Sequence, residues 1–318
     1  MKGWQSLLTT TAGLAFEPHD IASHLDGRGR YDVELDDEFP LLIKLFHYTS
    51  RRHTRAATWH DRLELFLPLD GAVRFRMGEQ EVDLRQGELL VVDNLKLHQV
   101  VDFPGFDTRV IVISFRPEFV YSLGSPTHDY AFLLPFYSKV ARRPHVLRSG
   151  TAGADEVYAV LARLLACYTA GSRQPFHQAG SKAFLLEVLY HLASHFRASE
   201  VVKWEFMRQQ ERSLRLKKVF EHINADPASR LSLVAASRLV GMTPPQFMKT
   251  FKQVAGMTLV AYLNHVRLGR AARLLRETTH SIADIASEAG FSDQSYFDRR
   301  FKRGFGVTPK EFRSDAGR

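Results

Sequence analysis

The sequence lacks the features that mark secreted, membrane-spanning or thiolate-metal proteins. It has a single cysteine, Cys167, in 318 residues, which excludes an intramolecular disulfide and a cysteine metal cluster. No apolar run approaches the ~20 residues that span a bilayer, and threonines at positions 9–11 make the N-terminal stretch a poor secretory signal. We therefore expect a cytoplasmic protein without a membrane partner.

Catalytic and nucleotide-binding motifs are missing as well. The sequence contains no Walker-type phosphate loop, no G-x-G-x-x-G after a strand pattern and no G-x-S-x-G nucleophile motif. Their absence weighs against a nucleotide-dependent enzyme and against an α/β-hydrolase. We expect a protein that is not an enzyme and that needs no cofactor.

Positive charge is confined to the last third of the chain. Residues 213–318 carry 18 Lys and Arg against 9 Asp and Glu, whereas residues 1–212 carry 25 against 26. A charge excess that served only solubility would be spread over both parts, but a nucleic-acid-binding module concentrates it. The distribution therefore indicates that the C-terminal third binds nucleic acid.

Residues from about 31 to 115 show a strand pattern. Short apolar runs recur at roughly ten-residue spacing, and steps such as Asp70-Gly71 and Gln86-Gly87 separate them. The runs are Leu41–Phe46, Leu63–Leu67, Val73–Phe75, Leu89–Val92 and Val110–Phe115. This pattern predicts a small barrel or sandwich.

The apolar period becomes helical between residues 155 and 196, in two segments separated by Gly171-Ser172 and Pro175. One apolar stripe consists of Val157, Val160, Leu161, Leu164 and Leu165, and the other of Phe184, Leu185, Val188, Leu189 and Leu192. We expect helices over about 153–198 that form an antiparallel hairpin, whose stripes either join two copies into a homodimer or pack within the domain. Residues 1–200 would then be one domain, and the polar residues 201–212 a linker whose composition is also compatible with a helix.

An internal repeat organises the predicted C-terminal domain, residues 213–318. A first helix carries one apolar face of Leu216, Val219, Phe220 and Ile223. Two pairs of short helices follow, 231–240 with 244–254 and 281–289 with 293–303. An offset of 50 residues pairs Phe247 with Phe297, Phe251 with Phe301, Lys249 with Arg299, Lys252 with Lys302, and Gly256 with Gly306. Two short helices joined by a glycine turn are a helix-turn-helix unit, and the sequence predicts two of them.

The turns of the two units carry matching residues. Gly241 and Gly290 stand where the chain needs a positive φ, and Thr243 and Ser292 are the predicted N-caps of the helices that follow. The prolines at 244–245 are tolerated only in a first helical turn, which is where this interpretation places them.

One continuous helix, Thr258–Glu277, is predicted to join the two units. Its twenty residues rise roughly 30 Å. That length approaches the ~34 Å between successive major-groove faces on one side of B-DNA. Both second helices could therefore enter adjacent grooves, so that one chain could read a site without dimerising.

These motifs resemble those of the AraC/XylS family of bacterial transcription regulators. The matching elements are Gly241-Met242-Thr243, Phe251-Lys252 and Gly256, then Ile282-Ala283-Asp284-Ile285-Ala286, Gly290-Phe291-Ser292-Asp293-Gln294-Ser295-Tyr296-Phe297, Phe301-Lys302, Gly306-Val307-Thr308-Pro309 and Phe312-Arg313. The second set is close to the family's most diagnostic motif, and the match covers about residues 213–313. The barrel and hairpin also look like the cupin-type effector domain and dimerisation helices of many members. The resemblance implies an α+β protein whose partners are double-stranded operator or promoter DNA, a small-molecule effector, RNA polymerase and a second copy of the chain.

Outward-facing positions on the second helices are the predicted DNA contacts. If Phe247 and Phe251 face the core, helical spacing turns the intervening positions outward. The set is Pro245, Met248, Lys249 and Lys252 in the first unit and Gln294, Ser295, Asp298, Arg299 and Lys302 in the second. These positions match those that contact DNA in the resembling family, and the alternative is that they are only solvated helix residues.

Side-chain chemistry assigns the roles within this set. Arg299 suits a bidentate contact to guanine, Gln294 could pair with adenine, and Asp298 could accept from cytosine. The lysines suit phosphates, which supply affinity and register. Pro245 and Met248 cannot form hydrogen bonds to bases through their side chains, so we expect the first unit to discriminate bases less sharply than the second.

His60, Glu64 and His98 form a second candidate site, inside the predicted barrel. They stand where cupin domains carry metal ligands, and imidazole and carboxylate groups can hold a divalent cation such as Zn²⁺. Thr58, however, occupies a position where enzymatic cupins have a further histidine. We therefore favour a polar effector pocket in which the three side chains form hydrogen bonds, with a metal site or a structural role as the alternatives.

Three functions compete. The first is a ligand-responsive transcription regulator, the second a cupin-type metal-dependent enzyme with an accessory DNA-binding domain, and the third an architectural DNA-binding protein. The incomplete metal set weighs against the enzyme. An architectural protein would discriminate little between bases, whereas a regulator should bind its own site at least ~10³-fold more tightly than other DNA.

Overall fold

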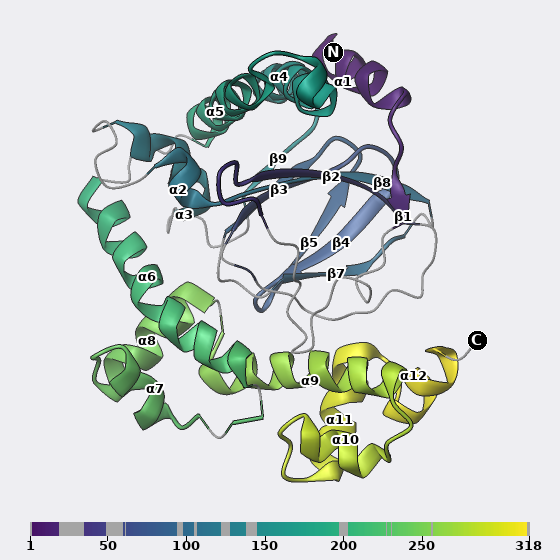
Figure 1. Ribbon diagram of the computed structural model, residues 1–318, viewed down its shortest axis with the longest axis vertical. Coiled ribbons are helices and arrows are strands. Elements are labelled where there is room, and N and C mark those ends of the chain that lie inside the picture. The colour runs from purple at the N-terminus through teal and green to yellow at the C-terminus, as the bar shows by residue number, and fades with distance from the viewer. Residues whose placement is uncertain are drawn as a thin grey trace.

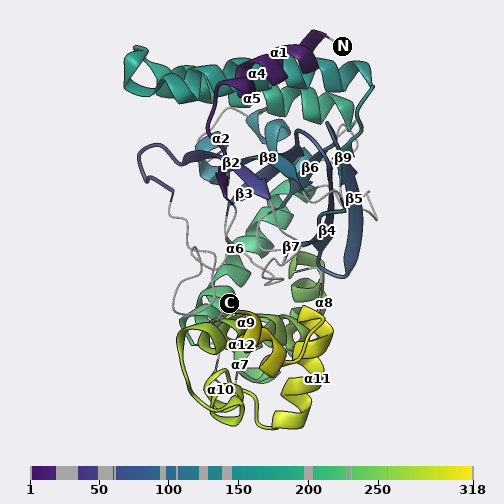
Figure 2. The ribbon, with the colours of Figure 1, turned by 90° about the vertical axis from the view of Figure 1, so that its right-hand side faces the viewer.

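The computed structural model has a sheet-rich N-terminal part and a helical C-terminal part (Figure 1). It describes residues 2–18, 35–48, 60, 62–93, 98–104, 107–121, 128–137, 145–196, 203–226, 228–229, 231–255 and 257–316. The sheets lie between a layer of helices at one end of the molecule and the C-terminal helices at the other (Figure 2). The predicted α+β class is therefore confirmed. Within the described segments, no helix combines the length and apolar character needed to cross a membrane.

Two sheets form the N-terminal part. One has the strand order β1-β2-β8-β3-β6-β9 and the other the order β5-β4-β7. The strands are β1 (Glu17–Pro18), β2 (Leu41–Tyr48), β3 (Leu63–Pro68), β4 (Ala72–Met77), β5 (Gln80–Arg85), β6 (Leu89–Val92), β7 (His98–Asp102), β8 (Thr108–Phe115) and β9 (Val146–Leu147). All five predicted apolar runs are strands. The polar strand β5 and strand β7 lack a strong apolar run and were not predicted.

Strand β3 shows that the larger sheet is buried on both of its faces. All six of its residues are buried. Leu65 packs in the core that the sheet forms with the helices, whereas Phe66 packs in a second core between the two sheets. Because side chains alternate along a strand, Glu64 lies on the same face as Phe66, toward the inside of the barrel.

Three helices cover the outer face of the larger sheet: α1 (Lys2–Ala12), α4 (Ala152–Ala170) and α5 (His177–His195) (Figure 2). The hairpin of α4 and α5 agrees with the prediction, and residues 197–198 of its expected range lie outside the described residues. Its apolar stripes are buried in the core of the same chain, with Phe184 packed at the edge. Of their two predicted uses, packing within the domain is therefore the correct one. Helix α1, which was not predicted, begins where Asp155 Oδ1 accepts the backbone amides of Gly3 and Trp4, at 2.9 and 3.2 Å.

Shorter helices complete the N-terminal part. They are α2 (Pro117–Val120), α3 (Leu134–Tyr137) and the 3₁₀ turns η2 (Asp129–Leu133) and η3 (Gly171–Arg173).

The C-terminal part consists of helices. They are α6 (Lys203–Ala225), α7 (Leu233–Leu239), α8 (Pro244–Ala255), α9 (Leu259–Glu277), α10 (Ile282–Glu288), α11 (Gln294–Phe305) and α12 (Pro309–Ala316). The predicted helix pairs are α7 with α8 and α10 with α11. The predicted linker, residues 201–212, is helical from Lys203 onward, because α6 begins there and continues into the residues that pack on α8.

Helix α9 joins the two units and takes part in two separate cores. Its first half contributes Tyr262 and Val266 to a core with Phe220 and Phe251. Its second half contributes residues 268–275 to a core built around the phenylalanines of α11. Each helix-turn-helix unit therefore buries its own apolar face, and one helix connects both.

The helix starts differ in detail between the two units. In the first, Thr243 donates its amide and hydroxyl groups to Oε1 of Gln246, at 3.2 and 3.1 Å, and the prolines at 244–245 open α8 as predicted. In the second, the N-cap is Asp293 and not the predicted Ser292, because α11 begins at Gln294 and the Asp293 carboxylate accepts the amide of Tyr296.

The turn of the second unit packs against the first unit. Gly290 has φ +93°, and a Cβ atom placed on it would lie 2.7 Å from Cα of Ala228 and 2.9 Å from Nε of Arg267. Arg267 on α9 also donates to the carbonyl oxygen of Ser229 at 3.0 Å. The segment after α6 is thus held between α9 and this turn. Gly241, the equivalent turn residue of the first unit, has φ +63° and open space around it.

These two glycines provide a matched pair of substitutions. Alanine at either position must adopt a left-handed conformation, which costs about 1–2 kcal/mol. Only Gly290→Ala also forces a methyl group against Ala228, and overpacking of this kind costs about 1–3 kcal/mol more. We expect Gly290→Ala to lower the free energy of unfolding more than Gly241→Ala in urea denaturation. Equal losses would contradict the packing observed at this turn.

Candidate functional site

Helix α8 presents a polar face away from the core. Phe247 and Phe251 are fully buried, as predicted from their spacing. The four predicted contact residues on the other face, Pro245, Met248, Lys249 and Lys252, are all exposed. Lysines on such a face have the charge needed to meet DNA phosphates.

Helix α11 has the same orientation in the second unit. Phe297 and Phe301 are fully buried, whereas Gln294, Ser295, Arg299 and Lys302 are exposed. Asp298 differs, because it is half-buried and its Oδ1 is buried without a hydrogen-bond partner. Burial raises the pKa of this carboxyl group above its usual value. Asp298 therefore lies at the margin of the exposed face.

Tyr296 is a residue of this helix to which sequence reasoning assigned no role. Its side chain is partly exposed, and its hydroxyl oxygen accepts a hydrogen bond from Nδ2 of Asn264 at 2.9 Å. Because Asn264 belongs to α9, this bond ties the start of the second recognition helix to the connecting helix. Only the fold brings these residues together, since they lie 32 positions apart.

A cleft of about 450 Å³ separates α6 from the turn of the first unit. Its lining residues are Glu211, Arg212, Arg215, Gly241, Met242, Gln246 and Thr250. Arg212 and Arg215 lie beside the start of α8, and Nη2 of Arg215 is paired with Oε1 of Glu211 at 2.6 Å. Arg212 was missed because residues 201–212 were predicted as a linker, and Arg215 because the first helix of the predicted domain was read only for its apolar face.

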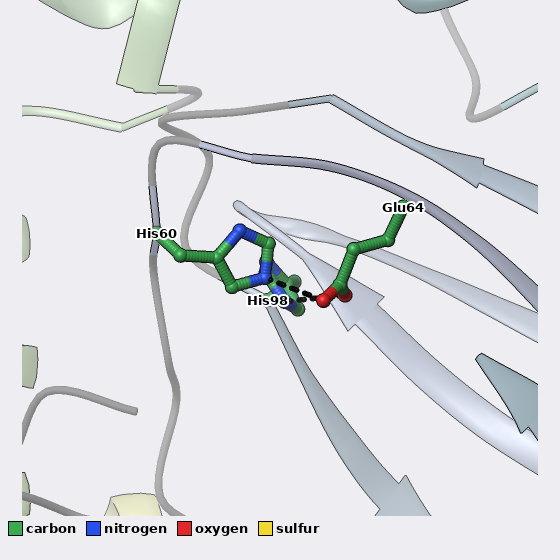
Figure 3. Close-up of side chains that lie close together, drawn as sticks. All are labelled: His60, Glu64 and His98. Atoms are coloured by element: carbon green, nitrogen blue, oxygen red, sulfur yellow. Dashed lines mark ion pairs between the residues drawn. The ribbon is translucent and has the colours of Figure 1, made fainter. Parts of the chain in front are cut away.

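In the barrel, the structure brings His60, Glu64 and His98 together (Figure 3). All three are buried, with 2–6% of their surface exposed. Nε2 of His60 lies 3.1 Å from Oε1 of Glu64, and Nε2 of His98 lies 3.6 Å from Oε2 of the same carboxylate. Thr58, the position that weighed against a metal site, lies outside the described residues.

Two residues that sequence reasoning did not include hold the carboxylate of Glu64. Nε of Arg62 donates to Oε1 at 3.1 Å, and the hydroxyl of Ser114 donates to the same oxygen at 2.8 Å. Ser114 stands opposite Glu64 in the antiparallel pairing of β3 with β8. Strand alternation could have suggested Arg62, but Ser114 depends on a register that the sequence does not show.

The charges of this cluster are set by burial and by one another. Burial lowers the pKa of His60 to about 4, so its ring is neutral at pH 7. For Glu64, burial alone would raise the pKa, but its contacts with His60, His98 and Arg62 lower it well below the usual value. The cluster at neutral pH therefore holds a carboxylate beside a neutral imidazole.

A partly buried histidine on α9 is influenced by charges from both parts of the molecule. Burial, with the positive charges of Arg300 and Arg76, lowers the pKa of His265 on α9 to about 4. Arg76 belongs to β4, so the charge of a residue in the three-stranded sheet acts on the helix that joins the two DNA-binding units.

Comparison with known proteins gives matches to both parts of the chain. A family model described as "AraC-like ligand binding domain" matches residues 42–189, and one described as "Helix-turn-helix domain" matches residues 236–315. The first range contains the barrel with its hairpin, and the second contains both recognition helices.

Two related sequences illustrate these matches. The transcriptional activator RhaR of Mannheimia succiniciproducens is 37% identical over 100 residues, which are 31% of this chain and 36% of that protein. The chain therefore spans about a third of the length of that relative. The uncharacterized regulator YdeC of Bacillus subtilis is 18% identical over 259 residues, 80% of this chain and 84% of that protein.

The solved structures with a similar fold include ToxT from Vibrio cholerae O395, bound to (E)-4-(8-methylnaphthalen-1-yl)but-3-enoic acid. It has a TM-score of 0.51 at 13% identity and covers 87% of this chain and 99% of its own. An apo form of ToxT from strain SCE256 has a TM-score of 0.50 at 12% identity, covering 89% and 99%.

The barrel, the paired helix-turn-helix units and the matches to both define a two-part DNA-binding regulator of transcription. The chain belongs to the AraC family of transcriptional regulators, with an N-terminal ligand-binding domain and a C-terminal helix-turn-helix DNA-binding domain.

The burial of His265 predicts a pH dependence of stability. The unfolded chain takes up a proton at this residue as the pH falls through about 6.5, whereas the folded chain does so only near 4. Its contribution to stability is therefore complete above pH 6.5 and is lost as the pH falls from 6.5 to 4. Between pH 7 and 5 this loss should be roughly 1–2 kcal/mol.

Urea denaturation at pH 7 and pH 5 measures this effect. His265→Gln should lose less stability than the parent protein between the two pH values, while His222→Gln, at an exposed position on α6, should lose as much as the parent. An unchanged pH dependence in His265→Gln would show that this histidine is protonated normally.

Proposed function

We propose that the protein is a ligand-responsive regulator of the AraC type that reads a specific DNA site with two recognition helices, α8 and α11, and has no enzymatic activity. The observation that carries the proposal is the exposure of matching faces on two helices that one helix connects. The 19 residues of α9 rise about 28 Å, close to the ~34 Å between adjacent major-groove faces.

The exposed residues divide into those that specify the base sequence and those that position the helices on the DNA. Arg299 reads guanine through its planar guanidinium group, and Gln294 reads adenine. Asp298, at the margin of this face, accepts from cytosine. Lys249, Lys252 and Lys302, with Ser295, hold phosphates and set the register. Pro245 and Met248 contribute only apolar contact.

The barrel is the proposed sensor of a small-molecule effector. His60, Glu64 and His98 supply the polar groups of its pocket, since the three lie on the inner face with their polar atoms directed at one another. ToxT, which shares the fold, has been seen with an organic acid bound. Its ligand supports a sensing role for this barrel but does not identify the effector.

Effector binding would act by shifting the packing of the barrel against the DNA-binding part. The charge of Arg76 acts on His265 across that boundary, so a change in the barrel can bias which arrangements bind DNA. We further propose that the protein acts as a homodimer in the cytoplasm and contacts RNA polymerase. DNA binding and transcription that do not depend on any effector would contradict the switch.

The two units should differ in how sharply they discriminate bases. Met248 and Pro245 cannot form side-chain hydrogen bonds, whereas Gln294 and Arg299 can. We expect single-base-pair changes in the half-site of α11 to cost about 1–3 kcal/mol each, and changes in the half-site of α8 to cost less. Affinities for operator variants across both half-sites measure this. Equal losses in the two half-sites would contradict the assignment.

Replacing Arg299 and Lys302 should separate base reading from phosphate binding. Arg299→Ala should cost about 1–3 kcal/mol at one base pair and relax the preference there. Lys302→Ala should weaken binding to all sequences. It should also reduce the magnitude of the slope of log affinity against log salt concentration by about 1. The control is Arg163→Ala, since Arg163 is exposed on α4 at the opposite end of the molecule (Figure 2). Loss of binding in this control would show that the effects are not local.

A further inference from the structure

The cluster of His60, Glu64 and His98 joins the two sheets of the barrel. Glu64 lies on β3 in the larger sheet, His98 is the first residue of β7 in the smaller sheet, and His60 precedes β3. Their polar atoms all lie within 4.8 Å of one another. A group bound here would contact both sheets at once.

The hydrogen bonds of His60 determine which ring nitrogen carries its proton. Nδ1 lies 3.0 Å from the carbonyl oxygen of Arg62. A carbonyl oxygen can only accept, so Nδ1 carries the hydrogen and Nε2 of the neutral ring has a free lone pair. This buried Nε2 lies 3.1 Å from Oε1 of Glu64. A cation placed between these two acceptor atoms could be bound by both of them.

A metal ion suits this position, because the lone pairs of Nε2 and of the carboxylate can both coordinate it. Metal-binding histidines characteristically donate their other N–H group to a backbone carbonyl or a carboxylate, as His60 does.

The remaining ligand atoms are oriented by their neighbours. Arg62 and Ser114 both donate to Oε1 of Glu64, which fixes the carboxylate and leaves Oε2 directed at His98. The His98 ring is stacked on Phe75, with centroids 5.8 Å apart and planes inclined by 9°. Such outer contacts hold metal ligands in place in known sites.

We propose that His60, Glu64 and His98 bind one divalent first-row transition-metal ion through two imidazole nitrogens and a carboxylate oxygen. The separations of 3.1 and 3.6 Å suit two ligands that each lie about 2.0–2.2 Å from one ion. Two imidazoles favour Zn²⁺, Co²⁺ or Ni²⁺ over Mg²⁺ or Ca²⁺, which prefer oxygen ligands. Three protein ligands leave a coordination position open to water or to a donor atom of an effector.

The proposed metal ion would occupy the proposed effector site. A regulatory role for the ion therefore rests on the proposed function, whereas metal binding by the three residues does not. Within the described residues, this is the one group of three His, Cys, Asp or Glu side chains arranged to share an ion. The close approach of the ligand atoms suits an ion better than an organic molecule at this position.

The test uses the full chain, stripped with a chelator and titrated with Co²⁺ and Zn²⁺. Equilibrium dialysis should give one ion per chain, bound Co²⁺ should show the visible absorption of a nitrogen- and oxygen-ligated ion, and metal should raise the midpoint of thermal unfolding. Mg²⁺ should produce none of these changes. Failure of the folded parent protein to bind one transition-metal ion per chain would overturn the proposal.

Variants assign the binding to this cluster. Glu64→Gln keeps the size of the side chain and should weaken binding at least 10–100-fold, and His60→Ala should do the same. Ser114→Ala, which removes only a hydrogen bond to Glu64, should weaken it about 10–100-fold. The matched control is His47→Gln, because His47 is a surface histidine of β2 that pairs with Asp107 away from the cluster. If His47→Gln lost binding while His60→Ala retained it, the ion would lie elsewhere.

Operator binding by the same preparations separates this inference from the proposed function. A parent protein that binds specific DNA but takes up no metal would overturn only the metal site. Stoichiometric metal binding without specific DNA binding would support the site and overturn the proposed regulator.

Discussion

Helix α9 is buried along both halves of its length, and the geometry of the DNA-binding part depends on this. Tyr262 packs among the phenylalanines of the first unit, and Leu275 packs in the core of the second. Neither unit can move along or around the helix without opening its core. The two units are also held together by the contact of Gly290 with Ala228 and by the hydrogen bond from Arg267 to Ser229. The spacing of the two recognition helices is therefore set by packing and not by a flexible connection.

The same packing explains how much of the fold could be predicted. Phenylalanines four residues apart must lie on one face of a helix, so Phe247 with Phe251 and Phe297 with Phe301 indicated both the recognition helices and their exposed faces. The beginning of α6 has no comparable apolar period, and its polar residues were read as a linker. The cap of α11 was misplaced by one residue, because Ser292 and Asp293 are both good N-caps and only the backbone conformation decides between them.

The barrel cluster was predictable in part for a similar reason. His60 and Glu64 are close in sequence and His98 stands near the start of a strand, so the residue types and their positions in a barrel suggested a shared site. The chemistry of the cluster, however, depends on Ser114 and on the carbonyl of Arg62. These partners follow from strand register and loop conformation, which one sequence does not specify. The tautomer of His60, and with it the electron-rich Nε2, could be inferred only from the structure.

The pairing of the strands places this cluster close to the DNA-binding part. His98 pairs with Met77 in the register of β7 with β4, and the neighbouring Arg76 pairs with Gln99. The positive charge of Arg76 acts on His265 of α9, and the next residue, Asn264, holds Tyr296 at the start of the second recognition helix.

A ligand that draws His98 toward Glu64 would thus pull on β7 and on its neighbour β4, whose Arg76 acts on His265 of α9 through its charge. The rigid joint of the two units would then carry any displacement of α9 to both recognition helices together, because neither core can yield separately. A switch of this kind changes the orientation of the whole DNA-binding part relative to the barrel. The spacing of its two recognition helices stays unchanged.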